Sequence, residues 1–153
     1  MTSRTQGRNT RGYRNRNPLN IRYSKNNHWQ GQQGSDAAGF CVFSAFIYGI
    51  RAAVLILKRY MQRGDNTISR IIERWAPPTE NSTSRYIRFV SKETTIPPDK
   101  VLDIYERGKV CAILRAMIKV ECANLVLPES YVTIGYDLAI TEPEKKQTNN
   151  TLL

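Results

Sequence analysis

The sequence predicts a mainly α-helical domain with one short β element near its N-terminal end. Its 153 residues suit a single domain that can bury its own core. Hydrophobic residues make up 41% of the chain, which is too many for a disordered protein. Apolar side chains recur at helical spacing in several stretches, and Pro, Gly, Asn or Asp bounds most of them. Together these observations favour short helices packed around one core.

Positive charge gathers at the start of the chain. The formal net charge is +10, and residues 1–35 hold seven basic residues and no acidic one. The very beginning of the chain is almost entirely polar or basic, so it has little to bury. We therefore predict a flexible basic arm at residues 1–12, a folded domain at 13–141 and a flexible polar tail at 142–153.

The first regular elements are expected after an irregular, polar segment. Residues 39–43 form a short apolar run behind a glycine, which is typical of a strand, and the β element is placed within residues 21–43. Ser44 is positioned to cap a helix over 45–61, because a serine hydroxyl can accept the free N–H groups of a first turn. The apolar residues of this stretch fall at helical spacing, and most of its basic residues lie away from them.

Four further helical stretches follow. Asn66 or Thr67 is expected to cap the second helix, which Pro77 and Pro78 end. The predicted ranges of the four are 67–75, 81–90, 106–121 and 128–140. The expected core draws on most of these elements. Its predicted members are Phe43, Phe46, Ile50, Val54, Leu57, Ile71, Ile72, Trp75, Ile87, Leu114 and Ile118.

Composition excludes several kinds of protein and site. No apolar run approaches the ~20 residues that a membrane-spanning helix needs, and no signal-peptide-like apolar stretch follows the first arginines. Three cysteines without CxxC spacing, Cys41, Cys111 and Cys122, predict reduced core thiols rather than disulfides or a zinc site. The single histidine, His28, cannot form a multi-histidine metal site. We therefore predict no metal and no cofactor.

Three blocks of sequence carry the most information. The first runs from Asn15 to Arg22, with Trp29-Gln30-Gly31 behind it. The second has the pattern GFxxFxxxxYGIRA, and the third has TIxxIIxRWAPPxENxTxxYI. Over about residues 11–91, these blocks resemble a family of small phage and prophage proteins known as structural protein P5. The resemblance implies a virion-associated structural protein with a lysozyme-like helical domain and other virion subunits as partners. It also implies location in the phage virion, or in the bacterial cytoplasm before assembly.

A second resemblance suggests a substrate. Bacterial β-N-acetylglucosaminidases of the lysozyme superfamily have an NNLFGIK-like segment, a WxG turn and an FRxY strand before a helix. Residues 17–22, 29–31 and 40–43 are similar to these in the same order. This resemblance implies a peptidoglycan glycosidase. The glucosaminidases carry their general-acid glutamate on a helix before the first segment, whereas here no carboxylate precedes Asp36.

Carboxylates elsewhere in the chain are the candidate catalytic groups. Glycoside hydrolysis normally needs an acid that protonates the leaving oxygen and a second carboxylate about 5–10 Å away. The candidates are Asp36, Glu73, Glu80 and Glu106, and we predict Glu80 and Asp36 as the pair, in either order. Asp36 could instead form a turn, and Glu80 could instead favour the N-terminus of the next helix. Glu73 and Glu106 fit ordinary helix charges better.

Amide and aromatic side chains predict the glycan contacts. Amides can bond sugar hydroxyls and N-acetyl groups, and an aromatic ring offers a face to a pyranose. The predicted glycan-binding residues are Asn17, Asn20, Trp29, Asn81 and Tyr86. For the asparagines the alternative is local, because Asn forms turns and bonds to nearby backbone.

The arginines at the start of the chain lead to a different prediction. Arginine interleaved with Asn and Gly suits the phosphate backbone of a nucleic acid, and it suits a neighbouring subunit equally well. The residues predicted for this contact are Arg4, Arg8, Arg11, Arg14 and Arg16. A non-enzymatic assembly component is therefore the alternative to a peptidoglycan-engaging domain, and a merely solubilising arm is the simplest interpretation.

Overall fold

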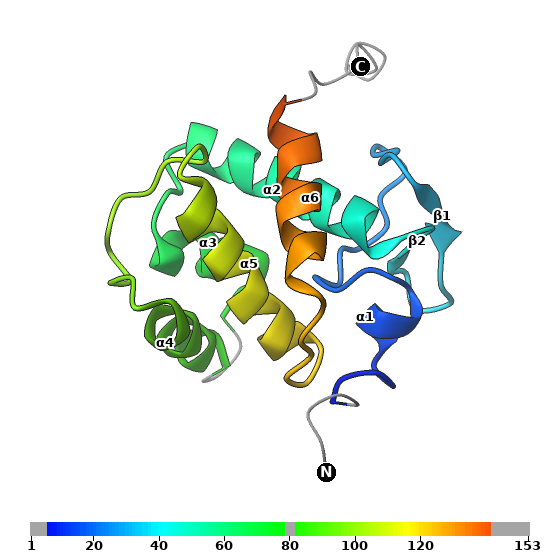
Figure 1. Ribbon diagram of the computed structural model, residues 1–153, viewed down its shortest axis with the longest axis horizontal. Helices are drawn as coiled ribbons and strands as arrows, with labels where there is room; N and C mark the ends of the chain where they lie inside the picture. The colour runs from blue at the N-terminus through cyan, green and yellow to red at the C-terminus, as the bar shows by residue number, and fades with distance from the viewer. Residues whose placement is uncertain (1–5, 79–81, 142–153) are drawn as a thin grey trace.

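The computed structural model describes residues 6–78 and 82–141. Within these ranges it contains six helices and a two-stranded sheet (Figure 1). The elements are α1 (Arg11–Arg14), β1 (Gln32–Ser35), β2 (Cys41–Phe43), α2 (Phe46–Gln62), α3 (Ile68–Trp75), α4 (Ser82–Thr94), α5 (Arg107–Glu121) and α6 (Glu129–Thr141). The prediction of a mainly helical fold with a small β element is confirmed.

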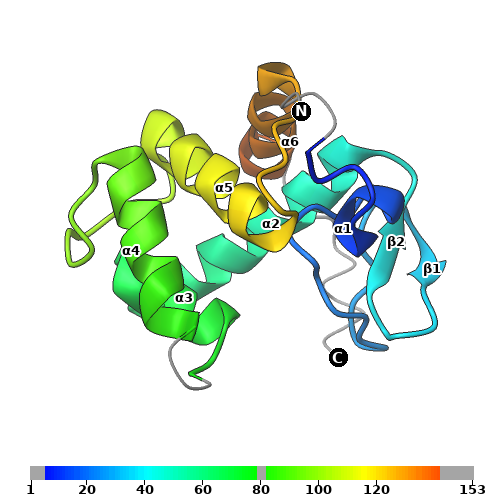
Figure 2. The same cartoon turned by 90° about the horizontal axis from the view of Figure 1, so that it is seen from below.

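Two groups of elements lie at opposite ends of the molecule (Figure 2). α1 and the β1–β2 hairpin lie at one end, α3 and α4 lie at the other, and α2 and α5 run between them. α2 packs most extensively against α6, while α4 packs against both α3 and α5. The C-terminal end of α5 points toward α1 (Figure 2), so this helix links the two ends of the molecule.

The sheet falls inside the segment predicted for it. β1 and β2 pair in antiparallel fashion, with Ser35 opposite Cys41. An isolated bridge joins Arg22 to Phe40, which ties the N-terminal segment to the same hairpin. Cys41 and Phe43 are fully buried, so the inner face of β2 belongs to the core.

The helix boundaries agree with the predicted ones to within a few residues, except that one cap differs. Thr67 Oγ1 accepts the N–H of Arg70 at 3.1 Å, which confirms Thr67 as the cap of α3. The N-cap of α2 is Ala45, so the prediction for Ser44 is wrong. The backbone N–H of Ser44 donates to the carbonyl of Gly31 at 2.8 Å. This bond holds Ser44 to the residue just before β1, and the helix starts one residue later than predicted.

The core forms where the apolar stripes of the helices meet. Phe46, Trp75 and Ile87 are partly buried and pack against its edge. The other predicted core residues are buried: Phe43, Ile50, Val54, Leu57, Ile71, Ile72, Leu114 and Ile118. The three cysteines are free and buried, as predicted. Of the helices described, none combines the length and the apolar character needed to cross a lipid bilayer.

The described part of the predicted arm lies against the domain. Gly7 has a positive φ of 81°, and a Cβ there would lie 2.2 Å from the carbonyl oxygen of Cys122. Thr10 caps α1 by accepting the N–H of Tyr13 at 3.4 Å. Residues 6–12 therefore contact the body of the protein, and the boundaries of the flexible arm and tail stay predictions.

Candidate functional site

The loop after α1 forms the base of the candidate site. The buried Asn17 side chain donates to the carbonyls of Ile21 and Cys41, both at 2.9 Å, and accepts the N–H of Ile21 at 3.0 Å. Gly49 of α2 permits a close approach, because a Cβ there would lie 2.7 Å from a carbonyl oxygen of this loop. The loop leads to Asn20, whose positive φ of 52° is a conformation that asparagine tolerates.

Glu121 lies at the C-terminal end of α5, on the side that faces the core. It continues the row of buried residues formed by Leu114, Met117 and Ile118 on earlier turns. Its side chain is only partly exposed to solvent. A carboxylate in such a row must find polar partners, because burying an unpaired charge costs free energy.

Two residues predicted to bind glycan meet at this carboxylate. Asn20 Nδ2 donates to Glu121 Oε1 at 3.0 Å and to its backbone carbonyl at 3.2 Å. The phenol of Tyr86, on α4, donates to Glu121 Oε2 at 2.9 Å. The site therefore joins the loop after α1, the helix α4 and the end of α5.

The surroundings of Glu121 favour its protonated form. Burial raises the pKa of its carboxyl group, while the hydrogen bonds from Asn20 and Tyr86 oppose the shift because they favour the charged form. The pKa of Tyr86 is raised well above its usual value, first by burial and then by the charge of Glu121. The phenol therefore keeps its proton and stays a donor. A carboxyl group with a raised pKa suits a general acid.

One acceptor of the site is left over. Asn20 Oδ1 is buried and has no hydrogen-bond partner among the described residues. Buried amide oxygens are normally bonded, since an unmade hydrogen bond leaves the desolvation of the atom uncompensated. This oxygen packs against α1, since a Cβ at Gly12 would lie 3.1 Å from it.

Asp36 has the opposite environment. Its Oδ1 accepts the backbone N–H groups of Ala38 and Phe40, and its Oδ2 accepts Asn15 Nδ2, all at 2.9 Å. Arg11 Nε lies 3.5 Å from Oδ2. These contacts lower the pKa of Asp36, the bond from Phe40 contributing most. Asp36 therefore stays ionised and holds a turn of the hairpin, which fits a base or a structural carboxylate rather than an acid.

Two predicted glycan ligands are packed into the fold. Asn17 is fully buried, with its amide bonded to backbone. Trp29 is 9% exposed, and the guanidinium of Arg59 on α2 lies 5.3 Å from the centre of its ring. The structure brings neither residue to Glu121. Their part in glycan binding stays a prediction, and both hold the hairpin side of the molecule together.

The described arginines of the N-terminal segment lie at the surface. Arg8, Arg11, Arg14 and Arg16 are all exposed. The guanidinium of Arg11 lies 4.5 Å from the ring centre of Phe40, and that of Arg22 lies 4.6 Å from it. The two cations lie over the same aromatic ring, so positive charge is concentrated beside the hairpin.

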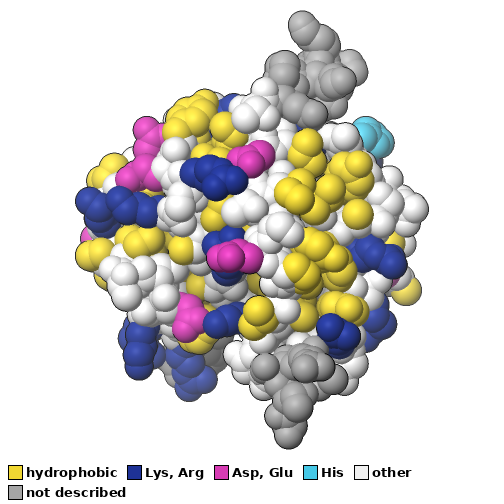
Figure 3. All heavy atoms as spheres, in the orientation of Figure 1, with side chains coloured by type: hydrophobic (Ala, Val, Ile, Leu, Met, Phe, Trp, Pro, Cys, Tyr) yellow, Lys and Arg dark blue, Asp and Glu magenta, His cyan; other side chains and the backbone are white. Residues whose placement is uncertain are grey.

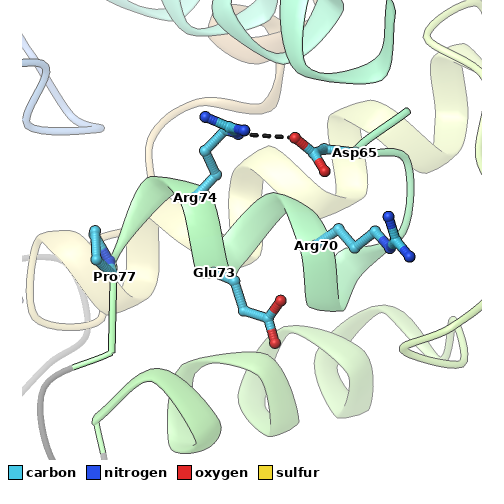
Figure 4. A pocket seen from close by; sticks show the side chains of 5 residues that line it. All are labelled: Asp65, Arg70, Glu73, Arg74 and Pro77. Atoms are coloured by element: carbon cyan, nitrogen blue, oxygen red, sulfur yellow. Dashed lines mark hydrogen bonds and ion pairs between the residues drawn. The ribbon is translucent and has the colours of Figure 1, made fainter. Parts of the chain in front are cut away.

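Glu73 lines a different hollow. This open hollow of about 510 Å³ is formed by Asp65, Arg70, Glu73, Arg74 and Pro77 (Figure 4). Figure 4 shows Arg74 turned toward Asp65, with Nε 2.8 Å from Oδ2, and Glu73 pointing away from Arg74. The two carboxylates do not face each other, so the hollow lacks the geometry of a catalytic pair.

The remaining predicted residues divide into two groups. Glu106 pairs with Lys109 at 2.9 Å, and the hydrogen bond from Lys109 is the main cause that lowers its pKa. Glu80, Asn81 and Arg4 lie outside the described residues. Within the described ranges, no three His, Cys, Asp or Glu side chains gather as a metal ion would need.

Sequence reasoning missed Glu121, although the chain holds a signal for it. Val110, Leu114 and Met117 form the buried stripe of α5, and Glu121 falls at the next position of that stripe. A charged residue at a core position is unusual unless it is paired or functional. Its partners could not be read from the sequence, because they come from distant segments.

The fold and the site define a small, mainly helical protein that holds one partly buried carboxyl group between an amide and a phenol. No family model matches the chain. The chain is 39% identical over 115 residues to Protein P5 of Pseudoalteromonas phage PM2, a match that covers 72% of this chain and 70% of the phage protein. It therefore belongs to the family of this phage protein, and the phage P5 part of the resemblance seen in its sequence is confirmed.

Proposed function

We propose that the chain is a virion-associated phage protein whose lysozyme-like domain engages the glycan of peptidoglycan and cleaves it with Glu121 as the general acid. Its relationship to a phage protein supports the first part. The observation that carries the second part is the contact of Glu121 with Asn20 and Tyr86. The similar glucosaminidases place their acid before the segment that corresponds to residues 17–22 here. Glu121 lies beside that segment in space although it follows it in sequence.

The geometry supports a defined sequence of proton movements. Glu121 would give its proton to the leaving glycosidic oxygen and become charged. The donors of Asn20 and Tyr86 would then stabilise the carboxylate, because hydrogen bonds to a charged acceptor are stronger than those to a neutral one. The sequence predicts Glu80 and Asp36 as a pair, and Glu80 lies outside the described residues. In substrate-assisted glycosidases an acetamido group of the substrate takes the place of the second carboxylate.

Purified full-length protein and intact peptidoglycan sacculi test this function. We expect release of soluble glycan by the wild type and a loss of about a hundredfold or more for Glu121→Gln, which cannot donate the proton. Glu73→Gln is the matched control, since it makes the same change at an exposed helix position, and it should release glycan at the wild-type rate. If the wild type neither binds the sacculi nor releases glycan, the peptidoglycan function is wrong.

The alternative is a non-enzymatic assembly component that binds nucleic acid or a neighbouring subunit. The exposed Arg8, Arg11, Arg14 and Arg16 support it, and so do the guanidinium groups of Arg11 and Arg22, which lie over the same ring of Phe40. Figure 3 also shows apolar side chains gathered on one face of the molecule. Exposed apolar patches often mark contacts between proteins.

Duplex DNA at several salt concentrations tests the nucleic-acid form of this alternative. Replacing both Arg14 and Arg16 with Gln should weaken binding and make the salt dependence shallower by about 2 in logarithmic slope, because fewer counterions are released. The matching change at Arg88, on α4, should leave the slope as it is. Equal binding by all three proteins would remove the role of these arginines.

A further inference from the structure

A second hollow lies next to the candidate acid site. It has a volume of about 350 Å³ and lies between α4 and the end of α5. The side chain of Tyr86 belongs to both places, because it lines this hollow and its phenol donates to Glu121. Phe89 and Val120 supply apolar walls, and Val120 is 38% exposed. One side chain, Tyr86, therefore connects the wall of this hollow to the carboxyl group of Glu121.

The hollow carries excess positive charge. Arg85 and Lys119 both line it. Lys119 Nζ pairs with Glu93 Oε1 at 2.7 Å, so its charge is partly neutralised. Arg85 is exposed and takes part in none of the ion pairs found within the described ranges. Apolar walls beside a guanidinium that has no carboxylate partner among the described residues favour a ligand that combines small apolar groups with a carboxylate.

We infer that this hollow binds the stem peptide of peptidoglycan, with a peptide carboxylate at Arg85 and alanine methyl groups against Phe89 and Val120. The sugar units of intact peptidoglycan are neutral, whereas the stem peptides carry free carboxylates and alanine side chains. The inference rests on the proposed function and deepens it, since it names peptide-bearing glycan, rather than bare glycan, as the preferred substrate.

Retention of the full-length protein on two materials tests the inference. The first is intact sacculi, and the second is the glycan strands that an amidase frees from the same sacculi by removing the stem peptides, captured on a solid support. We expect the wild type to bind intact sacculi about fivefold more tightly than stripped glycan. Arg85→Glu should lose about fivefold on intact sacculi and nothing on stripped glycan, in line with the modest strength of an exposed ion pair. Arg88→Glu makes the same charge change on α4 outside the hollow and should behave as the wild type.

Each other outcome overturns the inference. The amidase leaves a lactyl carboxylate on the glycan, so an equal loss for Arg85→Glu on both materials would assign Arg85 to that carboxylate instead. If Arg85→Glu binds both materials as the wild type does, while glycan is still released, the proposed function stands and the peptide site is wrong. If the wild type binds neither material, the proposed function and the inference fail together.

Discussion

Asp36 and Glu121 contact the same N-terminal segment, yet their surroundings shift their pKa values in opposite directions. Asp36 receives two backbone N–H groups and the Asn15 amide, with Arg11 close by. Glu121 receives one amide and one phenol at the edge of the core. The backbone N–H of Phe40, the Asn15 amide and other donors lower the pKa of Asp36, whereas burial raises the pKa of Glu121. A carboxylate near a predicted glycan-binding motif is therefore not enough to identify an acid, because the partners of the carboxylate decide its protonation.

The largest expected effect on stability comes from a change at Gly49, which packs against the N-terminal segment that contacts both carboxylates. A Cβ at Gly49 would lie 2.7 Å from the carbonyl oxygen of Arg16 and 3.2 Å from Pro18 Cδ. Gly49→Ala should displace the segment and reduce the free energy of unfolding by about 2–3 kcal/mol, as overpacking does. Denaturant unfolding followed by circular dichroism measures this.

Gly108 in α5 provides the control for that substitution. A Cβ there would meet no atom within 4 Å. Gly108→Ala should therefore leave stability unchanged or raise it by up to about 1 kcal/mol, through the better helix propensity of alanine. Equal unfolding midpoints for the two alanine variants would contradict the close approach at Gly49.

A smaller effect on stability is expected when the phenol hydroxyl of Tyr86 is removed from the Glu121 site. Tyr86→Phe removes the donor to Oε2 and should cost about 1–2 kcal/mol at neutral pH, because a partly buried carboxylate loses a partner. The pKa of Glu121 should rise further, so the cost should shrink at acid pH. Unfolding at both pH values measures this, with Tyr105→Phe, at a 63% exposed position, as an unaffected control.

The pH dependence of stability should separate the two carboxylates by sign. The pKa of Glu121 is raised from the usual 4.5, so folded protein binds this proton more tightly than the unfolded chain. The corresponding stability is present below the unfolded pKa and is lost as pH rises through the folded pKa. The stability of the wild type relative to Glu121→Gln should therefore fall between pH 4.5 and neutral pH. A flat difference would show that burial does not perturb this group.

The smallest effect is expected at Asp36 and has the opposite sign. Its pKa is lowered from 3.8, so the stability it provides is present above that value and is lost as pH falls through the folded pKa. The stability of the wild type relative to Asp36→Asn should therefore decrease below about pH 4. Glycan release by this variant should stay within about threefold of the wild type, well short of the loss typical of a catalytic acid or base. A hundredfold loss would instead make Asp36 the second catalytic carboxylate.

The difference between these two carboxylates also explains which structural features could be predicted from the sequence. Helices α2 to α6 could be predicted because each depends on its own apolar stripe, whereas the four-residue α1 has no such stripe and was not predicted. Asn66 or Thr67 was expected to cap α3, and Thr67 does so because its partner Arg70 is three residues away. The turn at Asp36 was an alternative for the same local reason. Ser44 was wrongly predicted because its partner, Gly31, belongs to another element.

The candidate site around Glu121 could not be predicted from the sequence. Asn20 and Tyr86 were selected as glycan ligands from the motifs that contain them, but nothing in those motifs indicates that they meet at one carboxylate. Glu121 lies on the buried stripe of α5, and the other residues of this stripe are apolar. Its role depends on how α4 and the loop after α1 pack around the end of that helix, which only the tertiary structure shows.

The hydrogen bond between Asn20 and Glu121 has a consequence for how the protein folds. It joins residues 101 positions apart, whereas the bond from Tyr86 to Glu121 spans 35. Closing so long a loop costs conformational entropy, so this contact is expected late in folding, after α5 and the N-terminal segment have docked. Until then Glu121 is an ordinary solvated carboxylate. A newly synthesised chain would form the candidate acid site only on completing its fold, and pulsed hydrogen exchange would follow the docking of the N-terminal segment.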